Sequence, residues 1–261
     1  MLGQRVRVYS TEAVALKRMD YGEADRIVTL FTPHVGKLRV MAKGVRRATS
    51  RMAGHLELFA HSQLLLARGR DLDVVTQATT IEPLREVRDD LQKSSYAYHL
   101  AELVDAFLQD RDPHPDLFAL LVDSLMTVGR DEVGADAVAR HFELRLLTTL
   151  GFGPELRNCL ECRNEIRAEA NWYSVTNGGV LCPPCGGHEA SAVPIDVRVL
   201  KMLRYLQRTT TPRALGVRVP GPVWGEVERL LRRQIEFVLE RKLRATDFVH
   251  RVATPAPAVE S

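Results

Sequence analysis

The spacing of apolar residues changes near residue 80 of this chain. Before this point, apolar and polar side chains alternate in short runs that are separated by Gly, Pro and charged turn residues, which predicts strands. The predicted strands cover residues 5–10, 13–18, 26–31, 37–43, 56–67 and 72–79. Five or six strands with turn signals about every ten residues indicate a small barrel, and an OB-fold is the barrel that we expect for residues 1–80.

From residue 91 onward, apolar residues recur every three or four positions, which predicts amphipathic helices. Three stripes precede residue 154: Tyr96, Leu100, Leu103 and Phe107; Leu117, Leu121, Leu125 and Val128; Val138, Phe142, Leu146 and Leu150. Two more follow residue 190: Val199, Leu200, Leu203 and Leu206; Val223, Val227, Leu231, Ile235 and Val238. We expect these stripes to form a helical core, followed by a disordered Pro/Ala tail over residues 251–261.

All four cysteines of the chain lie between the two groups of helices. Cys159 and Cys162 form one CxxC pair, and Cys182 and Cys185 form a second after nineteen intervening residues. Each CxxC turn can supply two thiolates to a tetrahedral Zn²⁺. Between the pairs, residues 172–175 and 180–181 read as strands joined by Asn-Gly-Gly, so a hairpin brings the second pair beside the first. The pattern predicts a zinc ribbon with one structural zinc.

Other roles for four thiols are disulfides, a redox pair or an iron–sulfur cluster. Residues 1–20 contain no apolar signal segment, so we expect a reducing cytoplasm in which disulfides do not persist. An iron–sulfur cluster uses the same ligands, and the spacing alone does not exclude it. Four thiolates close the coordination sphere, so we expect the metal to stabilise structure and not to activate water.

These predictions give an α+β multidomain organisation. We expect an N-terminal OB-fold β-barrel over residues 1–80, followed by an α-helical domain over residues 81–154 and 191–250. The four-cysteine zinc ribbon over residues 155–190 is then an insertion in that helical domain. The length of 261 residues and the 45% hydrophobic content suit such a protein. No apolar run approaches the ~18 residues of a membrane span, so we expect no membrane partner.

The net charge of +3 conceals an uneven distribution of charge along the chain. Residues 1–80 carry 13 Lys/Arg against 7 Asp/Glu, and residues 198–261 carry 13 against 6. The intervening residues 81–150 carry 7 Lys/Arg against 14 Asp/Glu. Two basic ends that flank an acidic middle suggest a polyanion at one surface and a different partner at another.

The densest basic segment covers the fourth predicted strand, residues 37–43, and the loop after it. No acidic residue occurs between Arg26 and Leu56. Exposed basic residues on a strand are most often simply solvated. Since no acid balances them here, the pattern favours a track for phosphates. The predicted contacts are Lys37, Arg39, Lys43, Arg46, Arg47 and Arg51.

Motifs for chemical catalysis are weak in this sequence. Neither GxxxxGK[ST] nor a GxGxxG turn is present, so ATP hydrolysis and dinucleotide binding are not indicated. The HxE segments at His55 and His141 resemble half of a nucleobase deaminase signature, but the required Pro before the first Cys is replaced by Asn158 or Leu181. We therefore expect a binding protein and not an enzyme.

Four segments in the first sixty residues resemble the bacterial recombination mediator family RecO. They are residues 21–28 (YGEADRIV), 36–37 (GK), 42–47 (AKGVRR) and 56–59 (LELF). The order of barrel, helices, four-cysteine insertion and final helices is also similar, over about residues 5 to 250. The basic barrel positions of the family correspond here to Lys37, Arg39, Lys43, Arg46 and Arg47, whereas Arg51 is included for its charge.

The resemblance implies a function in DNA repair and homologous recombination in bacteria. Members bind single- and double-stranded DNA, anneal complementary strands and, with RecR, help to load RecA onto strands coated by the single-strand binding protein SSB. It also implies that the acidic C-terminal tail of SSB docks on the protein, and we expect the helical domain to bind it. The implied location is the cytoplasm, in association with the nucleoid. The alternatives from other classes are a zinc-ribbon adaptor of transcription or RNA processing, and a hydrolase with unrecognised residues.

Overall fold

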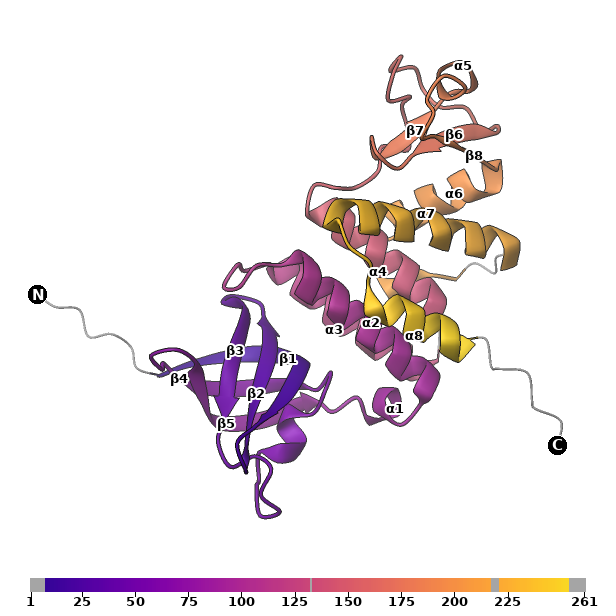
Figure 1. Ribbon diagram of the computed structural model, residues 1–261. Helices are drawn as coiled ribbons and strands as arrows, with labels where there is room; N and C mark the ends of the chain where they lie inside the picture. Colours follow the sequence, from indigo (N-terminus) through magenta and orange to yellow (C-terminus); the bar gives the residue numbers. More distant parts are fainter. Residues whose placement is uncertain (1–7, 132, 217–220, 254–261) are drawn as a thin grey trace, which may run out of the picture. The chain divides into compact units, whose positions relative to one another are not determined.

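The computed structural model describes residues 8–131, 133–216 and 221–253. The chain forms two compact units, which are described separately (Figure 1). The first contains the residues up to Arg130 together with those from Arg244 onward. The second contains Asp131–Leu243. The chain therefore leaves the first unit, builds the second, and returns to the first.

The first unit contains a closed five-stranded barrel (Figure 1). Its strands are β1 (Val8–Tyr21), β2 (Asp25–Thr32), β3 (Gly36–Ala42), β4 (His61–Ala67) and β5 (Asp73–Glu82). The strand order is β1-β2-β3-β5-β4, and β1 closes the barrel by pairing with both β2 and β4. All pairings are antiparallel except that of β3 with β5. This is an OB-like barrel, and the predicted fold class is confirmed.

The alternation of apolar residues places one face of each strand inside the barrel. On β3, Leu38, Val40 and Ala42 are buried in the core, as the sequence predicts. The predicted strands at residues 5–10 and 13–18 belong to one long strand, β1, as far as the described residues extend. Pairing continues through the polar residues between them because Glu12 lies opposite Gln63 of β4.

Four helices complete the first unit: α1 (Arg85–Arg88), α2 (Leu91–Phe107), α3 (Pro115–Arg130) and α8 (Arg244–Ala253). The side chain of Asp90 caps α2 by accepting a hydrogen bond from the amide of Lys93 at 2.8 Å. The predicted apolar stripes of α2 and α3 lie largely in the core. Phe118 of α3 packs edge-on against Phe31 of β2, with ring centroids 5.7 Å apart. Helix α2 also packs against α8.

The second unit combines three longer helices with a small sheet. The helices are α4 (Ala135–Thr149), α6 (Val197–Arg208) and α7 (Gly221–Leu239), and they pack against one another. The sheet consists of β6 (Asn171–Ser174), β7 (Gly179–Leu181) and β8 (Val193–Ile195), in the order β7-β6-β8. A single turn of helix, α5 (Pro183–Gly186), follows β7. The predicted hairpin therefore corresponds to β6 and β7.

The helices that the sequence groups into one domain are distributed over both units. Helices α1, α2, α3 and α8 belong with the barrel, whereas α4, α6 and α7 belong with the cysteine-bearing sheet. The domain boundaries at residues 80, 154 and 190 remain predictions. The predicted tail at residues 251–261 lies outside the described residues except for its first three positions, which continue α8.

Candidate metal centre and nucleic-acid interface

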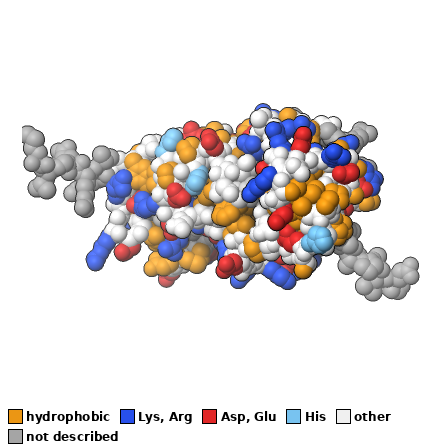
Figure 2. Space-filling view, turned by 90° about the horizontal axis from the view of Figure 1, so that it is seen from above, with side chains coloured by type: hydrophobic (Ala, Val, Ile, Leu, Met, Phe, Trp, Pro, Cys, Tyr) orange, Lys and Arg blue, Asp and Glu red, His pale blue; other side chains and the backbone are white. Residues whose placement is uncertain are grey.

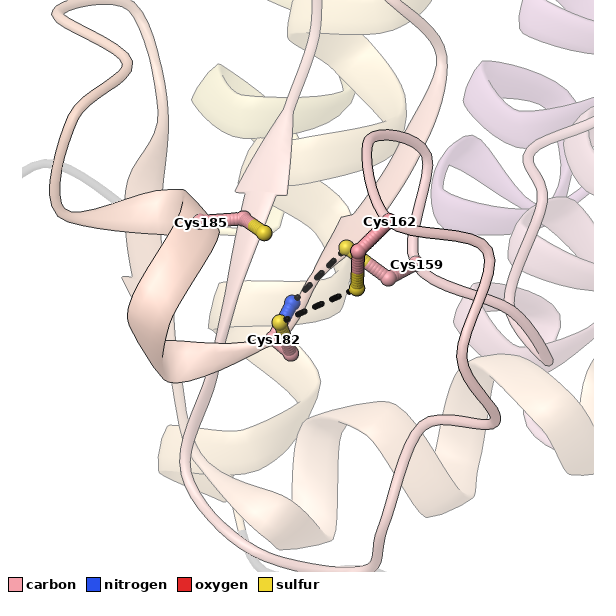
Figure 3. A group of neighbouring side chains, drawn as sticks. All are labelled: Cys159, Cys162, Cys182 and Cys185. Carbon is pink, nitrogen blue, oxygen red and sulfur yellow. Dashed lines mark hydrogen bonds between the residues drawn. The ribbon is translucent and has the colours of Figure 1, made fainter.

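The four cysteine side chains converge on one point of the second unit (Figure 3). Their sulfur atoms all lie within 4.8 Å of one another, and those of Cys162 and Cys182 are 3.7 Å apart. A tetrahedral Zn²⁺ with Zn–S bonds of about 2.3 Å would hold its sulfur atoms about 3.8 Å apart. The predicted ligand set is therefore brought together, and its dimensions suit a four-thiolate metal ion.

Local backbone structure gives each CxxC pair its knuckle shape. At the second pair, the amides of Cys185 and Gly186 donate to the carbonyl of Cys182 at 3.1 and 2.9 Å. At the first pair, the amide of Arg163 donates to the carbonyl of Cys159, and Arg163 adopts a left-handed φ of 63°. Gly186 is required by packing, because a Cβ there would lie 2.1 Å from the Trp172 ring.

The cluster contains one thiol that ionises readily. Burial of Cys159 disfavours its thiolate, but backbone amides, that of Cys182 foremost, donate to its sulfur and lower its pKa to about 6. The amide of Cys182 lies 3.4 Å from that sulfur. The pKa of Cys185 is raised to about 12, first through its interaction with the Cys182 thiol. Several thiolates this close repel one another, so a divalent cation is the group that would let all four ionise together.

A buried hydrogen-bond chain fixes the cysteine-bearing sheet to helix α7. Tyr173 of β6 is fully buried, and its hydroxyl donates to Oε1 of Gln234. The amide nitrogen of Gln234 donates in turn to the carbonyl of Phe152 at 2.9 Å. The position of the sheet, and with it the second CxxC pair, is therefore tied to α7.

The six basic residues predicted as a phosphate track differ in their availability. Arg39, Lys43, Arg47 and Arg51 are exposed, and none forms a salt bridge with another described residue. On the face of the molecule drawn in Figure 2, Lys and Arg side chains lie interspersed with Asp and Glu. A basic side chain that is paired with an acid is less available to bind a polyanion. The salt bridges of each residue therefore matter more than the number of basic residues.

Lys37 is one of the two predicted residues that are already engaged. Only 8% of this residue is exposed, and its Nζ donates to the backbone oxygen of Asp105 at 2.7 Å. The Asp105 carboxylate lies 3.3 Å from the same nitrogen and also pairs with Lys17. Burial alone would raise the pKa of Asp105, but the hydrogen bond from Lys17 and the charge of Lys37 lower it. Lys37 therefore joins β3 to α2.

Arg46 is the second engaged residue. Its Nε lies 3.3 Å from one carboxylate oxygen of Asp20, and the other oxygen of that carboxylate accepts a hydrogen bond from Arg26 at 2.9 Å. A second guanidinium nitrogen donates to the carbonyl of Gly22 at 3.3 Å. These contacts join the loop after β3 to the turn between β1 and β2. The sequence offers no local sign of this pairing, because Asp20 lies before the segment from Arg26 to Leu56 that contains no acidic residue.

The aromatic side chains available for stacking on the barrel are few. Phe31 and Phe59 are buried, which removes two of the four aromatic residues in this part of the sequence. The hydroxyl of Tyr9 donates to Asp73 at 2.6 Å, and the guanidinium of Arg68 lies over its ring. Tyr21 is 54% exposed at the end of β1. Register places this strand beside β2, so Tyr21 belongs to the same surface as Arg39, together with Lys17, which the sequence did not single out.

An apolar pocket of about 760 Å³ lies within the first unit, between β1, α2 and α8. Leu16, Leu58, Tyr98 and Phe248 supply its apolar lining. The rings of Tyr98 and Phe248 meet edge to face, with centroids 6.2 Å apart. Three basic residues also line the pocket: Lys17, Arg18 and Arg244. Lys17 and Arg18 are paired with Asp105 and Glu57, whereas Arg244 has no salt bridge among the described residues.

The structure defines a class of protein that combines an OB-like barrel with helices and a cluster of four cysteines from two CxxC turns. Its sequence matches the families described as "Recombination protein O N terminal" over residues 6–84 and "Recombination protein O C terminal" over residues 88–247. The chain therefore belongs to the RecO family of DNA repair and recombination proteins.

Relatives from several bacteria carry the name DNA repair protein RecO. The protein of Roseiflexus sp. (strain RS-1) is 39% identical over 94% of this chain and 86% of its own length. That of Dehalococcoides mccartyi (strain ATCC BAA-2266 / KCTC 15142 / 195) is 35% identical over 91% of this chain and 93% of its own length. That of Desulforamulus reducens is 34% identical over 95% of this chain and 96% of its own length.

Among the described residues, we find no helix with the length and apolar character needed to span a membrane.

Proposed function

We propose that this protein is a recombination mediator that binds single- and double-stranded DNA and anneals complementary strands. The observation that carries the proposal is a group of exposed cations on and after β3 that have no salt bridge to any residue that the structure describes: Arg39, Lys43, Arg47 and Arg51. Lys37 and Arg46 are left out of the direct contacts because their charges are satisfied within the protein.

Annealing follows from contacts that avoid the base edges. Cations that hold two strands by their phosphates lower the repulsion between the strands and leave the edges of the bases free to pair. Such contacts fix position without reading sequence, so the protein needs no chemical step and no cofactor turnover. We infer that it acts as a binding protein and not as an enzyme.

We propose zinc as the metal at the four cysteines. Cys159, Cys162, Cys182 and Cys185 would hold it, and a four-thiolate zinc supplies structural stability and no open coordination position. The cluster belongs to the second unit and the proposed phosphate contacts belong to the first. The metal is therefore expected to stabilise the small sheet without acting on DNA.

The proposed partners are RecR, the C-terminal tail of SSB and, indirectly, RecA, in the cytoplasm and associated with the nucleoid. An acidic peptide with an apolar end needs an apolar pocket with positive charge at its edge. The pocket lined by Leu58, Tyr98 and Phe248 has this character, with Arg244 beside it. We propose this pocket for the SSB tail, which moves the expected site from the helices alone to the junction of β1, α2 and α8.

The experiment measures duplex formation between complementary strands, both bare and coated with SSB. The charge variant carries Arg39→Ala, Lys43→Ala and Arg47→Ala. Each single-strand phosphate contact contributes about 0.7 to the slope of log K against log salt, so the variant should flatten this slope by about 2. Annealing of bare and coated strands should both slow.

The matched control removes three other exposed cations that have no salt bridge among the described residues: Arg85→Ala, Arg130→Ala and Lys201→Ala. It changes the net charge equally and should leave the slope and the annealing rate unchanged. A third variant, Tyr98→Ser, should anneal bare strands normally and coated strands slowly. Equal behaviour of the charge variant and its control would refute the proposed DNA site, and failure of the wild-type protein to anneal would favour the adaptor role.

A further inference from the structure

A row of apolar side chains crosses the outside of the barrel. The register of the strands pairs Met19 of β1 with Ile27 of β2, Ile27 with Met41 of β3, and Met41 with Val74 of β5. Cross-strand partners in such a ladder have neighbouring side chains on the same face of the sheet. The four residues therefore form one continuous row, the aliphatic row, across four strands.

The aliphatic row faces outward and is open. The adjacent residues Val28, Val40 and Val75 point inward and are at most 3% exposed, so their neighbours in the row point away from the core. Met19 is 58% exposed, and the other three members are partly exposed. Three strand intervals of about 4.8 Å give the row a length of about 14 Å, which is close to four stacked bases at about 3.4 Å each.

Positive charges lie beside the aliphatic row. Lys17, Thr29 and Arg39 lie on the outer face, each two residues along its strand from a member of the row, and register aligns them with one another. Lys43 follows directly after β3, on the other side of Met41. Arg39 and Lys43 have no salt bridge among the described residues. Asp25 shares this face, but its carboxylate accepts a hydrogen bond from the amide of Gly44 at 2.7 Å. The surface thus combines an apolar strip with cations that are free to bind anions.

We propose that unpaired bases of a single DNA strand lie on the aliphatic row while the adjoining phosphates contact Arg39 and Lys43. The assignment rests on the DNA binding proposed above for the barrel. A single strand carries flat apolar faces and regularly spaced negative charges, which is the combination that this surface complements. A protein partner fits less well, because four side chains, three of them partly buried, expose far less than the ~800 Å² that each partner of a standard interface buries.

The aliphatic row gives the barrel a preference that phosphate contacts cannot supply. Bases in a duplex are stacked inside the helix and cannot reach a protein surface with their faces, whereas unpaired bases can. Because aliphatic side chains have no hydrogen-bonding groups, the row should contact all four bases similarly. It should therefore favour single strands over duplexes without selecting sequence.

The test measures, by fluorescence anisotropy over a range of salt concentrations, how the wild-type protein and its variants bind duplex DNA and two single-stranded probes. One probe is a fluorescent single-stranded oligonucleotide, and the other has the same sugar–phosphate backbone without bases. The row variant carries Met19→Ser and Met41→Ser, and its control carries Ile81→Ser and Leu91→Ser, which are exposed apolar residues elsewhere on the first unit. Circular dichroism checks that both variants are folded.

The row variant should bind the ordinary strand about tenfold more weakly, with an unchanged salt slope and unchanged affinity for duplex DNA. The wild-type protein should prefer the ordinary strand to the base-free strand by a similar factor, and the row variant should have lost this preference. If the wild-type protein binds the ordinary strand and the base-free strand with equal affinity, that result alone overturns the proposal. If the row variant binds normally while the charge variant binds weakly, the assignment to the row is wrong and the proposed function stands. If neither variant changes binding, the proposed function is wrong as well.

Discussion

Replacing Tyr173 with Phe tests the attachment of the cysteine-bearing sheet to α7. The substitution removes one hydroxyl and leaves the ring in place. Gln234 is 2% exposed, so its Oε1 would lose its donor in a position that water does not reach freely. A buried polar group left without its partner costs about 1–3 kcal/mol, and we expect the free energy of unfolding of the second unit to fall by that amount.

Tryptophan fluorescence gives a direct measurement of this change. Both tryptophans of the chain, Trp172 and Trp224, belong to the second unit, so their emission during urea unfolding follows that unit. With an m-value of about 2 kcal/mol/M, the midpoint should fall by roughly 0.5–1.5 M. Tyr205→Phe is the matched control, because its hydroxyl donates to the Ala214 carbonyl in an exposed setting. Its midpoint should move by much less.

A double variant separates the hydrogen bond from the packing of the ring. Tyr173→Phe combined with Gln234→Leu removes both partners, so its loss of stability should be smaller than the sum of the two single losses. If Tyr173→Phe and Tyr205→Phe unfold at the same urea concentration, the hydrogen bond does not hold the sheet and the reasoning is refuted.

Two further predictions concern the metal and the acid stability of the first unit. Cys185→Ser should lose the metal and loosen residues 155–190 while leaving DNA binding unchanged; elemental analysis should find one zinc in the wild-type protein, and iron would contradict the assignment. The pKa of Asp105 lies below its ordinary value of 3.8, so its folded carboxylate contributes stability that is present above pH 3.8 and is lost as the pH falls through the folded pKa. Asp105→Asn should therefore unfold with a weaker dependence on pH in acid than the wild-type protein, and identical acid unfolding curves would contradict this role.

The barrel and the longer helices could be predicted because their apolar residues follow a local period. Helix α8 was not predicted, although Ala245, Phe248, Val249 and Val252 recur at helical spacing, because the run is only ten residues long and its start is set from elsewhere in the chain. Its first amides, those of Arg244 and Ala245, donate to the carboxylate of Glu102 at 3.0 and 2.6 Å. The capping group thus comes from a residue more than a hundred positions earlier, and no local start signal precedes the helix.

The candidate sites show the same contrast between local and distant information. The cysteines were selected correctly as one cluster because CxxC spacing acts over a single turn. The six basic residues look equivalent in the sequence, but Lys37 is buried against Asp105 of α2 and Arg46 is paired with Asp20 of β1. The aliphatic row was not recognised because its members come from four strands, and only their register brings them together.

The return of the chain to its first unit has a consequence for biosynthesis. Helix α8 packs against α2, but the ribosome makes the residues 131–243 before it reaches α8. At about 5–20 residues per second, this interval lasts roughly 6 to 23 s. During that time Tyr98 cannot contact Phe248, and Glu102 cannot accept hydrogen bonds from the first amides of α8, while the inserted unit can already fold. Completion of the first unit is therefore a late event of translation, and a nascent chain that stops before α8 leaves an apolar face of α2 open to chaperones.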